Sequence, residues 1–408
     1  MVAQAVTRWA RWFVAASAVF LVAWQAAALA DVPRQTRVVL AVHGFVLHAV
    51  FGKAYSLVPS YFDRSLAFVR APAVHFPLTA VGVVGLAVAP LPGTPSAVGP
   101  LAAALWTAGV VVFVATLAWT VRGNPTGRET GTGGPNAHRR GVDRYANAFV
   151  PVVLAYLLAG AYGTLGAFGG LTAAVAALPA TGSAPNAGAL PALGIAQTAH
   201  LLAAGTAALL IFAVGFRLFP RFLVASPPRA LVAAVLPAGA IAPALLAWDF
   251  YGATGFRVGA TLQAVAVVGF ALAYAALFAR SERRRVGFYA VLVGVGCGVL
   301  GVTLGLHFAF VGVAGELLAV HFRLNVLGFL GLTIIGATYQ FYPPSVGTFR
   351  GASDRTALAS VLLVGAGLLA EVGGALAGSE MAVLAGRGGA LVGTAVFAGL
   401  VLGVFLER

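Results

Sequence analysis

Long runs of apolar residues alternate with short polar breaks along the whole chain. Each run is about 20 residues long, enough for an α-helix to cross the ~30 Å hydrocarbon core of a bilayer. Twelve runs lie at residues 10–30, 38–60, 73–92, 99–121, 147–169, 193–219, 229–248, 258–280, 286–308, 320–343, 356–377 and 388–406. The pattern predicts an all-α, multi-pass integral membrane protein with about 12 transmembrane helices, in contact with membrane lipid.

The charged residues between the runs predict an orientation. If the N-terminus is cytoplasmic, 20 of the 25 arginines and lysines lie in cytoplasmic segments. The five that remain outside are Arg34, Arg37, Arg257, Arg323 and Arg387. Short loops with such an excess of positive charge stay in the cytoplasm. We therefore expect both termini to be cytoplasmic and the protein to lie in a prokaryotic cell membrane. The net charge of +14 reflects this topology and does not indicate a nucleic-acid partner.

Composition agrees with the membrane assignment. Hydrophobic residues make up 60% of the chain and charged residues 9%, against about 25% charged residues in soluble domains. The single cysteine, Cys297, excludes internal disulfides, cysteine-bound iron–sulfur clusters and CxxCH haem attachment. We expect it to be a small packing residue.

Three segments, beginning at His43, His200 and His321, can be aligned without a gap from a shared glycine to a shared proline fifteen residues later. The glycines are Gly44, Gly205 and Gly328, the prolines are Pro59, Pro220 and Pro343, and an aromatic residue (Tyr55, Phe216, Tyr339) stands four residues before each proline. The segments fall in the second, sixth and tenth apolar runs. A repeat of this kind fixes the architecture, so one membrane domain, 1–408, is predicted to contain three pseudo-repeated four-helix units.

The predicted units cover approximately residues 1–122, 145–281 and 286–408. The glycine-rich, basic stretch 122–144 separates the first two units and is predicted to be a flexible cytoplasmic loop. His138 belongs to this loop and is expected to be solvated.

The histidine near the start of each aligned segment is the candidate for chemistry. Ionisable residues inside a membrane are costly and mark functional sites. Helix rise places His43, His200 and His321 toward the outer side, with His307 at the same level. We predict that the first three bind haem iron, with His48 and His307 as secondary candidates. His48 follows His43 by five residues, about 140° around an α-helix, so the two should face different neighbours. His75 is expected at the cytoplasmic interface.

Imidazole binds haem iron, copper or zinc. A close zinc motif such as HExxH is absent, and no catalytic triad is apparent. Haem suits one histidine per helix, with small residues where the macrocycle packs, and the three aligned glycines meet that need. The competing interpretation is that the histidines only pack. Because the chain contains 52 glycines, glycines are expected at matching positions of aligned segments by chance.

These segments resemble subunit I of the haem-copper oxidase superfamily. HFRLNVLGFLGLTIIGATYQFYPP, from His321, is similar to that family's helix-10 signature, and HGFVLHAVFGKAYSLVP, from His43, resembles its helix-2 haem-binding segment. His200 stands where the cbb-type oxidase and nitric oxide reductase branch has its first copper histidine. The resemblance implies twelve helices in three arcs. It also implies that His43 is half of a low-spin haem site, that His321 is a high-spin haem ligand and that His200 faces it.

The chain departs from the family at two places. Arg323 stands where the family has its second low-spin haem ligand, and residues 231–248 lack the pair of helix-7 copper histidines. Departures of this kind resemble NnrS-type membrane proteins, which are linked to nitric oxide stress and denitrification. The resemblance then implies haem without copper. It also implies that Arg323 pairs with a haem propionate, with help from Arg34 and Arg37.

Three functions are compatible with these features. The first is a haem-binding protein that handles nitric oxide, another small diatomic gas or electrons without a binuclear copper centre. The second is a divergent terminal oxidase or nitric oxide reductase subunit, completed by another redox subunit; the missing copper histidines make this enzyme less favoured. The third is a cofactor-free transporter or assembly factor, although secondary transporters show two-fold rather than three-fold repeats.

Overall fold

The computed structural model describes residues 2–170 and 193–407, and every regular element in them is helical. Twelve helical segments there are long and apolar enough to cross a membrane, so the predicted all-α fold and the predicted number of apolar helices are confirmed. We number them spans 1 to 12. In order they are α1 (Val2–Leu29); α2, η1 and α3 (Arg34–Val38, Val39–Val46, Leu47–Tyr61); α4 (Ala71–Val88); α5 (Val98–Val121); η2, α6 and α7 (Gly134–Arg139, Arg140–Asn147, Val150–Ala167); α9, η4 and α10 (Ile195–His200, Leu201–Ala208, Leu209–Leu223); α11 (Arg229–Trp248); α12 (Thr254–Arg280); α13 (Val286–Phe310); α14, η5, α15 and η6 (Gly315–Arg323, Leu324–Gly331, Leu332–Phe341, Pro344–Val346); α16 (Asp354–Leu376); and α17 (Glu380–Leu406).

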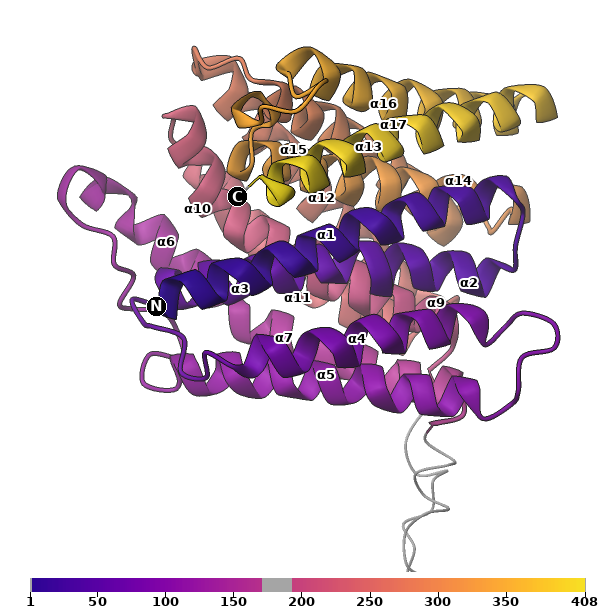
Figure 1. Cartoon of the computed structure of the whole chain (residues 1–408), viewed down its shortest axis with the longest axis horizontal. Helices are drawn as coiled ribbons and strands as arrows, with labels where there is room; N and C mark the ends of the chain where they lie inside the picture. The colour runs from indigo at the N-terminus through magenta and orange to yellow at the C-terminus, as the bar shows by residue number, and fades with distance from the viewer. Residues whose placement is uncertain (1, 171–192, 408) are drawn as a thin grey trace, which may run out of the picture.

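Three spans lie inside a ring formed by the others. Spans 3 and 4, 7 and 8, and 11 and 12 form long antiparallel pairs, and span 1 packs between span 2 and span 12 (Figure 1). Spans 4 and 5, and spans 8 and 9, are also neighbours. In the apolar stretches of spans 2, 6 and 10, 94, 78 and 67% of the residues are buried, against 39–56% in the other nine. The three inner spans therefore hold the residues that lipid does not reach.

Each inner span contains an eight-residue π-helical stretch: η1, η4 and η5. The aligned glycine of each span lies inside its stretch, and the three stretches contact one another at the centre of the bundle. π-helical turns are rare and concentrate at functional sites. The segments that aligned in the sequence thus share a backbone irregularity and meet in space.

The aligned glycines are required by close contact with the preceding span. A Cβ atom added to any of them would stand 2.4–2.8 Å from a side chain of that span, closer than packed atoms approach. The contacts are Gly44 with Phe20, Gly205 with Tyr156 and Gly328 with Cys297. Cys297 is buried at its contact, in agreement with the packing role expected for it.

Spans 9 and 10 also touch backbone to backbone, and this contact makes a test of the packing. A Cβ added to Gly336 would lie 2.4 Å from the carbonyl oxygen of Gly287, which no side-chain rotation relieves. We expect Gly336→Ala to push the spans apart and cost about 1–3 kcal/mol, lowering the unfolding temperature in detergent. Gly296→Ala, on the open side of span 9, has no atom within 4 Å to meet and should be neutral or stabilising. Equal losses in both variants would contradict this packing.

The stretch 122–144, predicted to be a flexible loop, is instead folded against the ends of spans 2 and 6. Asn124 donates from Nδ2 to the Phe62 carbonyl at 3.0 Å, and residues 134–147 form η2 and α6. Asp143 is 1% exposed and pairs with two arginines of α10. These hydrogen bonds and ion pairs join residues far apart in sequence, so the local composition did not reveal them. His138 is exposed, as expected.

Candidate functional site

Two of the three aligned histidines face each other between spans 6 and 10. The ring centroids of His200 and His321 are 6.3 Å apart and their planes differ by 21°. His200 ends α9 and His321 lies near the end of α14, so both stand just before the π-helical stretch of their span. The contacts among the π-helical stretches therefore bring together two imidazoles that are widely separated in the sequence.

Backbone carbonyls fix the protonation of both rings. Nδ1 of His200 lies 2.8 Å from the carbonyl oxygen of Ala196, and Nδ1 of His321 lies 2.9 Å from that of Gly301. A carbonyl only accepts, so each Nδ1 donates to it and each neutral ring keeps its lone pair on Nε2. Nδ2 of Asn325 lies farther from Nδ1 of His321, at 3.4 Å, and donates to the His321 carbonyl at 2.8 Å. Neither Nε2 has a hydrogen-bond partner within residues 2–170 and 193–407. A hydrogen bond from one ring nitrogen to a backbone carbonyl is typical of histidines that bind a metal ion through the other nitrogen.

The separation of the ring centroids is the one expected if both Nε2 atoms were bound to a single metal ion between the rings. Two metal–nitrogen bonds of ~2.0–2.1 Å, with each ring centroid about 1 Å farther out, place the centroids about 6 Å apart. In the described part of the chain, no group of three or more His, Cys, Asp or Glu side chains is arranged to hold an ion. Two imidazoles alone do not complete a zinc or copper site. Haem iron, whose macrocycle supplies the other ligands, fits this donor set.

Apolar and small residues surround the pair. The Phe250 ring lies 5.2 Å from His200 and the Phe308 ring 5.5 Å from His321. A Cβ added to Gly305 would only just touch the His321 ring, at 3.4 Å. Flat aromatic walls suit a macrocycle. Sequence reasoning missed these residues because nothing distinguishes them among the 27 phenylalanines of the chain.

The third aligned histidine, His43, is not part of this pair. It is buried between spans 4 and 5, with its ring 4.7 Å from Trp106 and Nε2 3.0 Å from the Thr164 hydroxyl. That hydroxyl already donates to the Gly160 carbonyl, so Nε2 of His43 donates and the lone pair lies on Nδ1. Nδ1 is buried and makes no hydrogen bond. Haem ligation by His43 remains a prediction, and its available atom is Nδ1.

His48 points elsewhere, as its position on the helix predicted. Its ring packs on Phe20 and Phe13 of span 1, and its Nδ1 lies 3.0 Å from the carbonyl oxygen of His43. Its Nε2 is buried and has no hydrogen bond. His307 lies in the last turn of α13, with its ring on Phe308. Both remain secondary candidates.

His75 was expected at the membrane interface; its depth in the membrane stays a prediction, but its side chain is not directed outward. His75 is fully buried, with Nδ1 3.1 Å from the Tyr55 hydroxyl and its ring 4.5 Å from Phe51. Although it lies in the first turns of α4, it faces span 2 rather than water. The position of a residue in the sequence gives its depth along a helix but not the direction in which its side chain points.

Arg323 is buried and paired within the protein. Its Nη2 and Nε lie 2.6 and 2.8 Å from Oε2 of Glu371, whose Oε1 accepts from Nε of Arg387 at 3.0 Å. The Arg323 guanidinium also lies 5.0 Å from the Trp24 ring. Its Nη1 has no hydrogen-bond partner, so a role toward a haem propionate remains a prediction. Sequence analysis missed Glu371. The signal that could have identified it is the presence of an ionisable residue inside an apolar run.

Comparison of the chain with protein-family models and with curated protein sequences gave no match. The function proposed below therefore rests on the sequence motifs and on the geometry of the histidine pair.

Proposed function

We propose that this chain is a haem-binding integral membrane protein in which His200 and His321 hold the haem iron from opposite sides. The observation that carries the proposal is the pair of facing imidazoles, 6.3 Å apart, with both Nδ1 atoms directed at backbone carbonyls. When bound, haem would supply one-electron redox chemistry. A haem held by both histidines would favour electron transfer over binding of nitric oxide or another diatomic gas.

We further propose that units 1–122, 145–281 and 286–408 are structural repeats of the kind seen in subunit I of haem-copper oxidases. The supporting features occur once in each unit. They are a π-helical stretch in the inner span, an aligned glycine packed on the span before it, and an outer antiparallel pair of spans. The arginine distribution supports cytoplasmic termini in a prokaryotic cell membrane.

The test is the absorbance spectrum of detergent-purified protein, oxidised and reduced, with haem and copper assayed per chain. We expect a Soret band, about one haem and no stoichiometric copper, and a reduced spectrum that carbon monoxide barely changes. A colourless protein after expression with ample haem would overturn the proposal. A large shift with carbon monoxide would mean an open iron position and favour gas binding. Haem with stoichiometric copper would favour a divergent oxidase or nitric oxide reductase subunit.

A further inference from the structure

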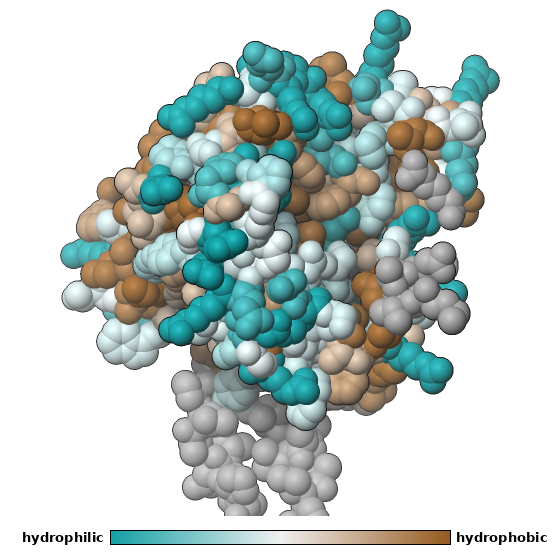
Figure 2. All heavy atoms as spheres, turned by 90° about the vertical axis from the view of Figure 1, so that its left-hand side faces the viewer, coloured by the Kyte–Doolittle hydropathy of each residue, from teal (hydrophilic) through white to brown (hydrophobic). Residues whose placement is uncertain are grey.

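A polar pocket lies at the end of spans 2 and 6 opposite the histidine pair. It has a volume of about 180 Å³ and is lined by Arg217 and Arg221 of α10, by Ser60 and Tyr61 of α3, and by loop residues 130–133 and 136. None of the lining residues carries a carboxylate. The face of the protein at this end gathers hydrophilic residues (Figure 2). A single water needs only about 10–15 Å³ of such space, so the pocket admits a larger polar group.

Arg217 is held rigidly at the base of this network. Its Nη1 donates to the Tyr61 carbonyl at 2.8 Å and to Oδ1 of Asn147 at 2.5 Å, and its Nη2 donates to the Thr130 carbonyl at 3.3 Å. Its guanidinium lies 3.9 Å from the centre of the Tyr61 ring and is 3% exposed. A charge fixed in this way needs little reorganisation to receive an anion.

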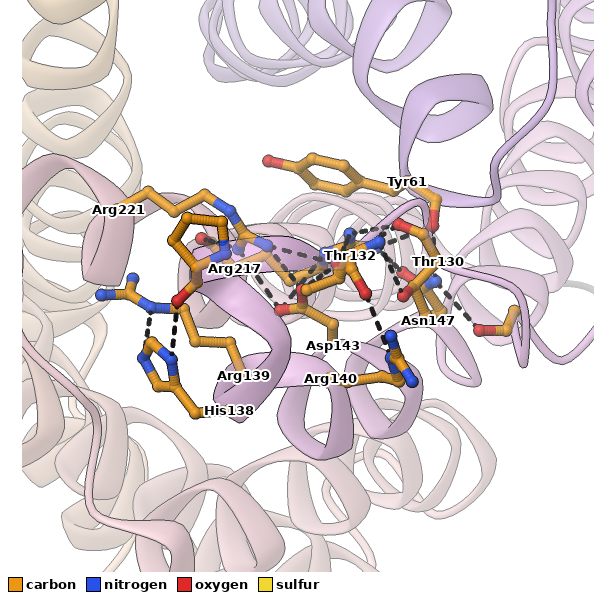
Figure 3. A network of polar contacts seen from close by, with 12 residues as sticks. Tyr61, Thr130, Thr132, His138, Arg139, Arg140, Asp143, Asn147, Arg217 and Arg221 are labelled. Atoms are coloured by element: carbon orange, nitrogen blue, oxygen red, sulfur yellow. Dashed lines mark hydrogen bonds and ion pairs between the residues drawn. The ribbon is translucent and has the colours of Figure 1, made fainter.

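The network has more positive than negative charge. Arg217 and Arg221 converge on Asp143 and Thr132 (Figure 3), and Nη2 of Arg221 lies 2.5 Å from Oδ2 of Asp143. Arg140 donates from Nε to the Thr132 carbonyl at 3.1 Å and adds a further cation beside the loop. Two carboxylates thus lie close to these three arginines: the buried Asp143, and Asp63, whose Oδ1 is 3.2 Å from where a Cβ of Gly131 would stand. The remaining excess of positive charge favours an anion.

Neutral donors complete the lining. The loop turns at Gly131, with φ of +58°, and the backbone N–H groups of Gly131 and Gly133 make no hydrogen bond in the described part of the chain. Ser60 and Tyr61, which each carry a hydroxyl group, are also lining residues. Free backbone N–H groups around a glycine turn, next to arginine, are a usual setting for bound phosphate.

We propose that this pocket binds a phosphate group. Two sources share this chemistry: a soluble phosphate and the headgroup of an anionic phospholipid. Arginine donates N–H groups to phosphate oxygens. The Nη atoms of Arg221 already donate to Asp143, Thr132 and the Arg217 carbonyl, but its side chain is 27% exposed and its Nε has no hydrogen bond, so Nε is the donor available to a phosphate. The site is independent of the histidine pair and of haem.

The experiment compares wild type, Arg221→Gln and Tyr61→Phe, each as the full chain. One arm measures binding of inorganic phosphate by calorimetry in detergent, and the other measures retention of phosphatidylglycerol against phosphatidylcholine by native mass spectrometry. We expect wild type to bind one of the two probes and Arg221→Gln to weaken that binding about tenfold or more, since a hydrogen bond to a charged group is lost. Tyr61→Phe leaves the Arg217–Arg221–Asp143 network in place, so it keeps the test valid if Arg221→Gln folds poorly.

The matched control is Arg64→Gln, because Arg64 is a partly exposed arginine at the same end of the protein, paired with Glu129 and outside the pocket lining. It should bind the probe as wild type does. Phosphate binding alone would identify a soluble ligand, and selective phosphatidylglycerol retention alone would identify a headgroup. Binding of neither probe by wild type would overturn the proposal, as would equal losses in Arg64→Gln and the two pocket variants.

Discussion

Replacing His321 by alanine is expected to reduce the haem content of the purified protein from about one per chain to nearly none. Gly301 and Asn325 hold the His321 side chain and backbone in place, so its Nε2 is presented as a fixed ligand. His200→Ala should instead leave some haem bound through His321. This haem should be a five-coordinate, high-spin species whose absorbance spectrum shifts when carbon monoxide is added. Haem per chain and the reduced spectrum with and without carbon monoxide measure both effects.

His138→Ala is the control for these variants, because His138 is an exposed histidine in the stretch 122–144. It should retain wild-type haem. His43→Ala separates the two ligand assignments, since His43 lies with Trp106 and Thr164 rather than with the pair. Loss of haem in His43→Ala together with full retention in His321→Ala would show that the facing pair is not the haem site.

The second large effect is expected at Glu371. Removing this carboxylate by Glu371→Ala leaves Arg323, which is buried, without its counter-ion. Breaking a buried ion pair from one side costs about 3–5 kcal/mol, because the remaining charge is uncompensated. We expect a large fall in unfolding temperature and in yield of folded protein. The double variant Arg323→Leu/Glu371→Leu should recover much of this loss, because it removes both charges, and Arg387 is 22% exposed and can reach water.

Asp31→Ala provides the comparison for Glu371→Ala. Asp31 also pairs with an arginine, Arg37, at 3.2 Å, but its side chain is 79% exposed. Exposed pairs of this kind contribute about 0–1 kcal/mol, so stability should hardly change. Similar stability of Glu371→Ala and Asp31→Ala, or a double variant less stable than Glu371→Ala, would refute the stabilising role of the Arg323–Glu371 pair.

The twelve spans were predictable because each is an apolar run of membrane length, and this signal is local. The start of span 5 could not be predicted in this way, because the sequence of α6 is polar and resembles a loop. What folds it is the ion pairing of Asp143 with Arg217 and Arg221, more than 70 residues later in the chain. Composition over a short window does not contain such a partner.

The histidine pair was partly predictable for a similar reason. Alignment of the three segments placed His200 five and His321 seven residues before the shared glycine, at a similar depth, and the structure makes them neighbours. The same alignment grouped His43 with them, although its ring contacts spans 4 and 5 instead. Alignment gives depth along a helix, whereas direction around the helix depends on how spans pack and, for His75, on the contact with Tyr55.

The π-helical stretches control the direction in which these histidine side chains point around their helices. Their i→i+5 hydrogen bonds take one residue more per turn than an α-helix, so the part of a span before the stretch is out of phase with the part after it. Closing η4 to an α-helix of unchanged length would rotate His200 by about 100° relative to α10, because the residue that the wide turn absorbs would then advance the helix. The same change in η5 would rotate His321 relative to α15. The histidines can therefore be re-aimed, during evolution or by design, by substitutions that close a π-helical turn at constant length, whereas closure with loss of one residue largely keeps their direction.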